Sequence, residues 1–239
     1  MSGALIETRG LGMRFGGVQA VQGVNFMLAE RELRCVIGPN GAGKSTFFKM
    51  LTGQLQPTEG AVLYRGEDIS RSQAHEIARR GIGIKTQVPS VFDGLSVREN
   101  LWLAARRIHN GSGARAAVDE MLERIGLSAI AGRIVGQLAH GQRQWVELGI
   151  VLSTDPELVL LDEPAAGMTQ EEVLRTAELI RQINKTKALI VVEHDMQFIR
   201  MIANKVTVFN QGEVLVEDDV EKILHNPRVR DVYLGKKAA

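Results

Sequence analysis

The sequence predicts an α/β protein with a mixed sheet, an antiparallel β subdomain near the start and an inserted α-helical subdomain. Three observations predict this fold class. Short apolar runs without polar alternation are typical of parallel strands that are buried on both faces. A glycine-rich segment follows the first of these runs and precedes a helical pattern. The middle of the chain has helical periodicity.

Size and composition restrict the class of protein further. The chain has 239 residues, of which 44% are hydrophobic and 24% charged, as in ordinary globular proteins. With 29 basic and 28 acidic residues the net charge is +1, which argues against nucleic acid as a partner. Cys35 is the only cysteine, which fits a reducing compartment. No apolar run approaches the ~20 residues that span a bilayer, so we expect a cytoplasmic protein, for which any membrane role must come through a partner.

The first predicted elements are strands at Leu5–Arg9 and Gln22–Leu28, which define an antiparallel β subdomain over residues 1–32. A buried strand follows at Leu33–Ile37, and a helix is expected at Ser45–Leu51. These two elements begin the α/β core, which we assign to residues 33–90 and 153–239 of one domain, 1–239.

The segment from 91 to 152 is predicted to be a helical subdomain inserted into this core. Ser96 and Glu99 form a capping box that starts its first helix. Gly111-Ser112-Gly113 is interpreted as a turn. Trp102 and Trp145 are expected to pack inside the subdomain. Further helices are predicted at Ala116–Ile125 and Gln142–Leu152.

The core resumes with two apolar strands, Glu157–Leu161 and Ala188–Val192. The chain then returns in a hairpin, in which Lys205–Phe209 pairs with Glu213–Glu217 around Asn210-Gln211-Gly212. An antiparallel hairpin beside parallel strands makes the predicted sheet mixed.

The most specific motif is a glycine-rich loop of the pattern G-x-x-x-x-G-K-[ST], with a strand before it and a helix after it. Its glycines allow successive backbone N–H groups to face inward toward phosphate, and the helix N-terminus adds partial positive charge. Lys44 supplies a charge for the β- and γ-phosphates, and the Ser45 hydroxyl can bind Mg²⁺. The loop residues are Gly38, Pro39, Asn40, Gly41, Ala42, Gly43, Lys44, Ser45 and Thr46.

Two acidic residues follow the apolar strand Leu158–Leu161. A carboxylate at the carboxyl end of such a strand lies beside a phosphate loop, so Asp162 is predicted to hold Mg²⁺ directly or through water. Glu163, one residue later, is placed to polarise a water for attack on the γ-phosphate.

Five further segments resemble those of ABC-transporter ATPases in order and spacing, and together they cover nearly the whole chain. Phe15 matches the aromatic that stacks on adenine, and Gln87 matches the glutamine that joins the core to the helical subdomain. Leu138-Ala139-His140-Gly141-Gln142 stands in place of the signature Leu-Ser-Gly-Gly-Gln. Residues 164–169 match the loop that crosses the dimer interface, and His194 matches the histidine that contacts the γ-phosphate.

The resemblance implies an ABC ATPase with the P-loop NTPase fold, which binds ATP and Mg²⁺. It assigns catalysis to Lys44, Gln87, Glu163 and His194, and metal binding to Ser45, Gln87 and Asp162. It assigns nucleotide contacts to Phe15, to the phosphate loop and to the signature residues Ala139, His140, Gly141 and Gln142.

Two residues depart from the family pattern. Ala139 replaces the signature serine, whose hydroxyl contacts the γ-phosphate bound by the partner subunit. We therefore expect a closed dimer that is weaker by ~1–2 kcal/mol. Thr169 replaces the aspartate that ends the interface loop, and with Glu172 it is predicted to form a capping box.

The resemblance also implies the assembly. Two such chains, identical or similar, would face each other head to tail with ATP between one phosphate loop and the other signature segment. Integral-membrane permease subunits would dock near Gln87, Val88, Pro89 and Phe92 on the inner face of the membrane, and a substrate-binding protein would act indirectly.

Within the family, the chain resembles the importer branch for branched-chain amino acids and for urea or short-chain amides. His140–Trp145, Glu193–Met196 and the tail from Asn226 to Gly235 resemble the urea-type ATPases most, so urea is the first expectation and branched-chain amino acids the alternative. Three other classes stay open: a non-transport ABC ATPase, a small-molecule kinase and a regulatory module without turnover.

Overall fold

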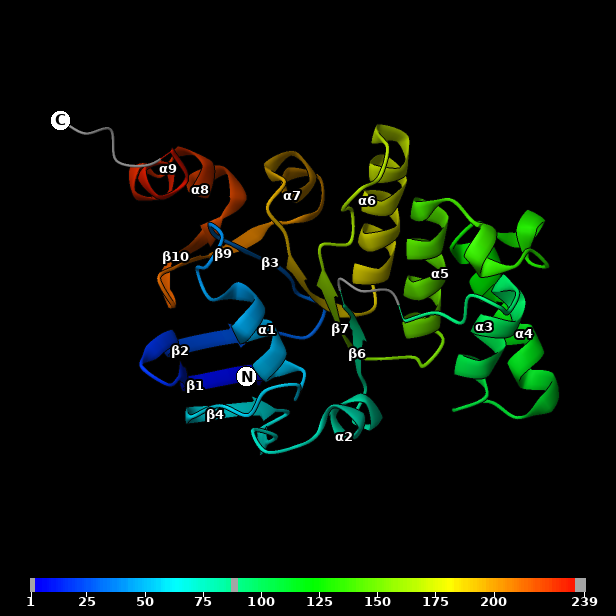
Figure 1. Ribbon diagram of the computed structural model, residues 1–239, viewed down its shortest axis with the longest axis horizontal. Coiled ribbons are helices and arrows are strands. Elements are labelled where there is room, and N and C mark those ends of the chain that lie inside the picture. Colours follow the sequence, from blue (N-terminus) through cyan, green and yellow to red (C-terminus); the bar gives the residue numbers. More distant parts are fainter. Residues whose placement is uncertain (1–2, 87–89, 235–239) are drawn as a thin grey trace.

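The computed structural model describes residues 3–86 and 90–234 and is built around a six-stranded mixed sheet (Figure 1). The strand order is β10-β9-β3-β8-β7-β6. All neighbouring pairs are parallel except β9 and β10, which form the antiparallel hairpin that the sequence predicts. The strands are β3 (Leu33–Ile37), β6 (Ile82–Lys85), β7 (Leu158–Asp162), β8 (Ala188–Val192), β9 (Lys205–Asn210) and β10 (Glu213–Asp219).

A second, antiparallel sheet of four strands has the order β2-β1-β4-β5. Its strands are β1 (Ile6–Phe15), β2 (Val18–Leu28), β4 (Glu59–Tyr64) and β5 (Glu67–Asp68). The segment 1–32 therefore supplies only the first two strands, since β4 and β5 join the sheet after the chain has passed through the phosphate loop. The sequence prediction lacks β4 and β5 in this sheet, because their pairing joins strands that are distant in sequence.

The helices cover the six-stranded sheet and form a group at one end of the molecule, where α3 and α4 lie beyond α5 (Figure 1). Two 3₁₀ turns, Ser128–Ile130 and Val135–Gln137, connect α4 to α5. The helices are α1 (Lys44–Leu51), α2 (Ala74–Arg79), α3 (Val97–Ala105), α4 (Gly111–Arg124), α5 (His140–Leu152), α6 (Gln170–Asn184), α7 (Met196–Ile202), α8 (Val220–His225) and α9 (Pro227–Leu234).

Alternation along the buried strands divides the core into two clusters. On β3, Cys35 and Ile37 join the cluster that packs against α5, α6 and α7, whereas Val36 joins the cluster with α1 and the antiparallel sheet. The same alternation recurs on β7 and β8. The central sheet is therefore apolar on both faces, as the absence of polar alternation in the sequence predicts.

Two local predictions in the helical segment are wrong. Gly111-Ser112-Gly113 is not a turn, because these residues form the first turn of α4. Trp102 is 41% exposed on α3, whereas Trp145 is buried and donates a hydrogen bond to Thr176 Oγ1 at 2.9 Å. The predicted capping box of Ser96 and Glu99 is confirmed at the start of α3.

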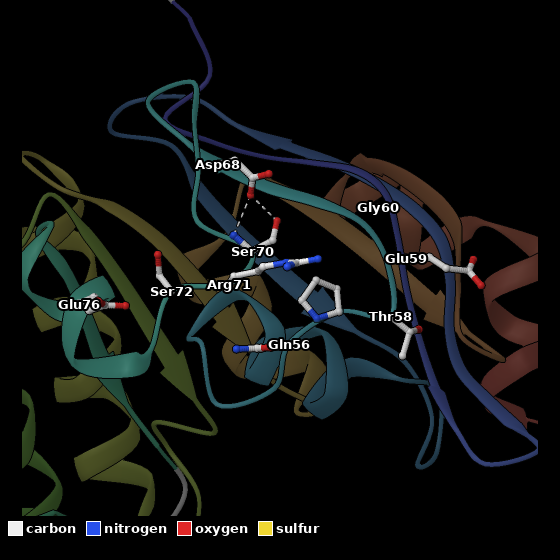
Figure 2. A pocket seen from close by; sticks show the side chains of 10 residues that line it. Gln56, Thr58, Glu59, Gly60, Asp68, Ser70, Arg71, Ser72 and Glu76 are labelled. Carbon is white, nitrogen blue, oxygen red and sulfur yellow. Dashed lines mark hydrogen bonds between the residues drawn. The ribbon is translucent and has the colours of Figure 1, made fainter.

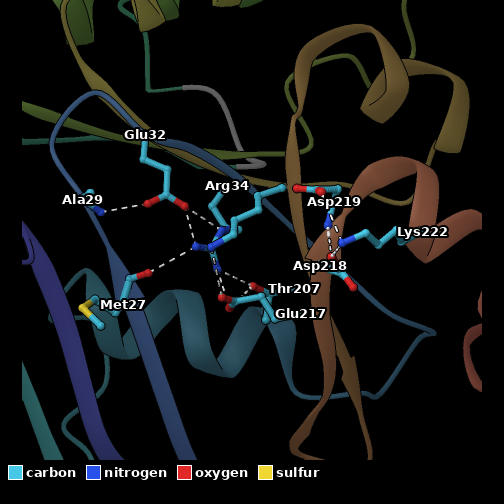
Figure 3. A network of polar contacts seen from close by, with 10 residues as sticks. Met27, Ala29, Glu32, Arg34, Thr207, Glu217, Asp218, Asp219 and Lys222 are labelled. Carbon is cyan, nitrogen blue, oxygen red and sulfur yellow. Dashed lines mark hydrogen bonds and ion pairs between the residues drawn. The ribbon is translucent and has the colours of Figure 1, made fainter.

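A buried arginine connects the antiparallel sheet to the C-terminal hairpin (Figure 3). Arg34 on β3 is 1% exposed and forms ion pairs with Glu32 and with Glu217 on β10. It also donates hydrogen bonds to Thr207 Oγ1 on β9 and to the Met27 carbonyl on β2. The network connects the two sheets near the start of β3, the strand that leads into the phosphate loop.

Candidate functional site

The phosphate loop connects β3 to α1 and depends on glycine where the chain turns back on itself. Gly43 has φ of 100°, in the left-handed region, and a Cβ there would lie 2.6 Å from the Ala20 carbonyl oxygen. Gly38 has φ of 151°, and a Cβ there would lie 2.3 Å from the Phe209 carbonyl oxygen. Larger residues at these two positions would collide with backbone, so the curled loop requires both glycines.

Lys44 is the first residue of α1, and its side chain folds back over the loop. Its Nζ donates hydrogen bonds to the carbonyl oxygens of Gly38 at 2.7 Å and Pro39 at 3.0 Å. Burial lowers the pKa of Lys44, while the charges of Glu163 and Asp162 act in the opposite direction. The ammonium group is thus held by two loop carbonyl oxygens, and the charges of Glu163 and Asp162 favour its protonated form.

The loop surrounds a pocket of about 200 Å³. The structure brings Ser45 of the loop and the acidic pair Asp162 and Glu163 together in this pocket, as the sequence predicts. The lining residues are Ala20, Asn40, Gly41, Ala42, Gly43, Lys44, Ser45, Thr46, Asp162, Glu163 and Val192.

The acidic pair lies at the carboxyl end of β7. Burial raises the pKa of Asp162, and the charge of Glu163 raises it further, against the lowering effect of Lys85 and Lys44. Glu163 has φ of 47°, which is unusual for a residue with a side chain, and its N–H donates to the Val192 carbonyl at 2.9 Å. Backbone strain of this kind is typical of functional sites.

His194 meets Glu163 directly. Its Nδ1 lies 3.2 Å from Glu163 Oε1, and its side chain is 63% exposed. The predicted histidine and the predicted general base are therefore in contact in a single chain, although His194 itself does not line the pocket.

Glu193 is a residue that the sequence interpretation missed. It is 2% exposed, and its carboxylate accepts backbone N–H groups of His194 at 3.0 Å and of Asp195 and Ala165 at 3.4 Å. Burial raises the pKa of Glu193, and these hydrogen bonds lower it. One buried carboxylate therefore connects the histidine segment to the interface loop. Its only sequence marker is an acid at the end of an apolar strand.

The signature segment does not reach the pocket of its own chain, since none of its residues lines that pocket. His140, at the start of α5, places Nε2 3.1 Å from the Ala166 carbonyl oxygen in the interface loop. Ala139 donates its N–H to Gln142 Oε1 at 3.3 Å.

The remaining predicted residues divide between exposed positions and residues outside the described ranges. Phe15 is 47% exposed at the end of β1 and does not line the pocket. Phe92 is 61% exposed. Gln87, Val88 and Pro89 lie outside the described residues.

A larger, open hollow of about 680 Å³ is lined by the start of β4, by β5 and by the segment that leads from β5 into α2 (Figure 2). Asp68 and Ser70 border it, and Asp68 Oδ1 accepts the N–H and hydroxyl of Ser70. None of the residues predicted to act on nucleotide lines this hollow.

The phosphate loop, the acidic pair and the histidine form a candidate nucleotide site, and comparison with known proteins specifies the family. The family model described as ABC transporter matches residues 21–166, more than half of the chain. This chain belongs to the ATP-binding subunits of ABC transporters, which hydrolyse ATP.

Two relatives match along nearly their whole length. The high-affinity branched-chain amino acid transport ATP-binding protein BraF of Pseudomonas aeruginosa is 36% identical over 99% of this chain and all of the relative. LivG of Escherichia coli K12, which has the same descriptive name, is 37% identical over the same shares. Both relatives are named for branched-chain amino acid transport, and neither is named for urea.

Solved structures agree on the fold. The ADP-bound ATP-binding cassette MJ1267 of an ABC transporter has a TM-score of 0.86 at 26% identity and covers 98% of this chain and 99% of its own. CbiO1 of Clostridium perfringens, part of the ABC transporter complex cbiONQ, also has a TM-score of 0.86 at 26% identity, over 98% and 96%. The predicted fold class is confirmed. Over residues 3–86 and 90–234, no helix is both long and apolar enough to cross a membrane.

Proposed function

We propose that this chain powers an ABC importer for branched-chain amino acids by hydrolysing ATP between two copies of itself or between itself and a similar ATPase. The observation that carries the proposal is the whole-length identity of 36–37% to two branched-chain amino acid ATPases. The pocket supports the same function, because it unites a phosphate loop with a carboxylate pair.

The phosphate loop is proposed to bind the β- and γ-phosphates of ATP. Inward N–H groups and the N-terminus of α1 supply the partial positive charge, and Lys44 supplies a full one. Lys44 donates to two loop carbonyl oxygens, and on ATP binding phosphate oxygens would replace them as its hydrogen-bond acceptors. Phe15 is proposed to stack on adenine. Its exposed ring is at the end of β1, and the next strand, β2, carries Ala20, which lines the pocket.

Mg²⁺ is proposed to bind at Ser45 and Asp162, with Gln87 as a third group. The donors fit the ion, because Mg²⁺ is usually held by one or two carboxylates together with substrate phosphates. Bound there, Mg²⁺ supplies charge neutralisation at the β- and γ-phosphates.

Glu163 is proposed to orient the attacking water and His194 to steady the γ-phosphate. The 3.2 Å contact between them supports the assignment, because the carboxylate holds the imidazole at the edge of the pocket. Gln87 is proposed to report nucleotide occupancy to the helical subdomain.

The second half of the site is proposed to come from the signature residues Ala139, His140, Gly141 and Gln142 of a partner chain. These residues stay away from the pocket of their own chain, which fits a site completed by a head-to-tail partner. Permease subunits are proposed to dock beside Phe92, which places the chain at the inner face of the membrane with its substrate-binding protein acting indirectly.

The ATPase assignment is tested by Glu163→Gln. The variant should bind ATP and accumulate as an ATP-bound dimer while turnover falls by roughly 100- to 10,000-fold, because the general base is lost. Phosphate release and size-exclusion chromatography measure the two effects. Glu178→Gln, at an exposed position of α6, is the matched control and should turn over normally. Wild-type turnover in Glu163→Gln would remove Glu163 from this role.

The cargo is tested by uptake of labelled leucine and labelled urea in cells with and without this protein. Loss of leucine uptake alone is expected. Loss of urea uptake alone would instead support the urea-type ATPases that His140–Trp145 resembles, with the same ATPase chemistry. If neither uptake falls, both proposed cargoes are contradicted.

A further inference from the structure

A buried ion pair joins the core to the helical subdomain. Lys85 is the last residue of β6, and Glu147 lies in the middle of α5. Their side chains are 1% and 3% exposed, and Lys85 Nζ lies 3.4 Å from Glu147 Oε2. The other carboxylate oxygen of Glu147 accepts the Ser90 N–H at 3.1 Å.

The pair is not arranged for maximum stability. Its separation exceeds the 2.7–2.9 Å of a strong charge-assisted hydrogen bond. Within the described parts of the chain, Lys85 Nζ and Glu147 Oε2 have no hydrogen-bond partner. Replacing such a buried pair by apolar residues is often neutral or stabilising, so stability alone does not account for the two charges.

The two residues connect the two halves of the proposed site. Lys85 pairs in register with Leu161 on β7, directly before Asp162. Glu147 is on the helix that starts with signature residue His140, seven residues earlier, or about 10 Å along the helix axis. Because α5 is continuous between them, a constraint on Glu147 orients the signature segment.

We propose that Lys85 and Glu147 are a positioning pair that sets the angle of α5 against β6, and thereby the approach of the signature segment to the partner's nucleotide. The proposal rests on the proposed function and deepens it. Neither residue touches nucleotide. The pair acts through α5, whose rotation against the sheet changes the distance between two fully buried charges.

The test separates positioning from stability with the double variant Lys85→Met, Glu147→Met. Its melting temperature should equal or exceed that of the wild type. Its affinity for ATP as a single chain should stay within about twofold, because the phosphate loop is untouched. Its kcat should fall by roughly ten- to hundredfold, as small misplacements of a catalytic arrangement do. In the Glu163→Gln background, its ATP-driven dimer should be weaker by a similar factor.

A matched control removes an ion pair within the helical subdomain. Arg98 and Asp119 are exposed and join α3 to α4 at 2.6 Å without reaching β6. The control Arg98→Met, Asp119→Met should keep wild-type kcat and dimerisation. Glu147→Gln is a second variant, which keeps an acceptor for Ser90 and removes only the charge. It should also lower kcat.

Wild-type kcat and dimerisation in the folded double variant would overturn the positioning role. If the pair were merely structural, the double variant would change in melting temperature but would keep its kcat and its ATP-driven dimerisation. Absence of turnover in the wild type would contradict the proposed function, whereas a dimer unchanged by Lys85→Met, Glu147→Met would contradict the pair alone. The two failures are therefore distinguishable.

Discussion

Ala139 is the N-cap of α5, the residue position whose side chain normally accepts a free N–H of the first helical turn. An alanine cannot do this, and only the reverse half of a capping box remains, in which the Ala139 N–H donates to Gln142 Oε1. In the proposed dimer, the same methyl group takes the place of a serine hydroxyl that would meet the partner's phosphate. One substitution therefore weakens both the start of the helix and the proposed contact with the partner's nucleotide.

Ala139→Ser should restore both contacts, and they can be measured separately. Without nucleotide, the free energy of unfolding should rise by about 1 kcal/mol, because the N-cap is completed. With ATP in the Glu163→Gln background, the dimer should tighten by about 1–2 kcal/mol from the added charge-assisted hydrogen bond.

Denaturant melts and sedimentation measure the two effects of Ala139→Ser. Ala139→Gly, which adds no hydroxyl, is the control and should leave the dimer constant near that of the wild type. A stabilised helix without a tighter dimer would show that position 139 does not face the partner's phosphate.

Residues that act through nearby sequence could be predicted, and residues that act through distant contacts could not. The phosphate loop is contiguous, and its geometry follows from glycine, lysine and a helix start. Glu193 acts on the Ala165 N–H, 28 residues earlier in the chain, and Lys85 meets Glu147 across two subdomains. Only the fold brings such partners together, so no local pattern marks them.

At the scale of elements, helix starts with paired caps were predictable because capping boxes are local. Ser96 with Glu99 and Thr169 with Glu172 both form them, as expected. The segment from Gly111 to Gly113 shows the limit of local rules. Two glycines favour a turn, but Asn110 stands at the N-cap and the amphipathic residues that follow bury one face of α4. Packing therefore overrides the weak helix propensity of glycine.

The interface loop ends at the N-cap of α6, where Thr169 Oγ1 accepts the Glu172 N–H at 3.4 Å. Thr169→Ala should lower the free energy of unfolding by about 0.5–2 kcal/mol, since the cap is lost. Thr169→Asp restores the family's residue and also caps helices, so its stability should stay near that of the wild type. Thermal melts compare the three chains.

The Thr169 variants also separate helix stability from dimerisation. Thr169→Asp isolates the interface, because any change in ATP-driven dimerisation then arises from the carboxylate rather than from the helix. Equal stability of Thr169→Ala and the wild type would contradict the capping role.

At the scale of the whole molecule, two apolar clusters enclose one sheet, and the phosphate loop emerges from the middle of it. Burial of β3, β7 and β8 on both faces was predictable from their apolar runs. The strand order was not, because an apolar run carries no information about which strands pair with it. The antiparallel sheet likewise gains β4 and β5 from beyond the loop. Binding at the loop should therefore stabilise both sheets together.

Cys35 offers a direct measure of that coupling. It is the only cysteine, it is 0% exposed, and it lies between Val191 of β8 and Val206 of β9 in the centre of the sheet. Burial raises the pKa of its thiol, and the charge of Glu193 raises it further. A thiol reagent should thus react with the native chain only when the sheet opens.

Labelling of Cys35 by Ellman's reagent should therefore be slow in the native chain and should become slower with ATP. At a nucleotide concentration of 100 times Kd, mass action stabilises the closed state by about 2.7 kcal/mol, which is roughly a hundredfold decrease in rate when reclosing outpaces labelling. Lys44→Ala, which loses the loop's ammonium group, should show little protection at the same concentration.

Rapid labelling of the native chain, unchanged by ATP, would mean that the sheet opens independently of the loop. Protection that depends on Lys44 would establish that the loop and the central sheet open as one cooperative unit.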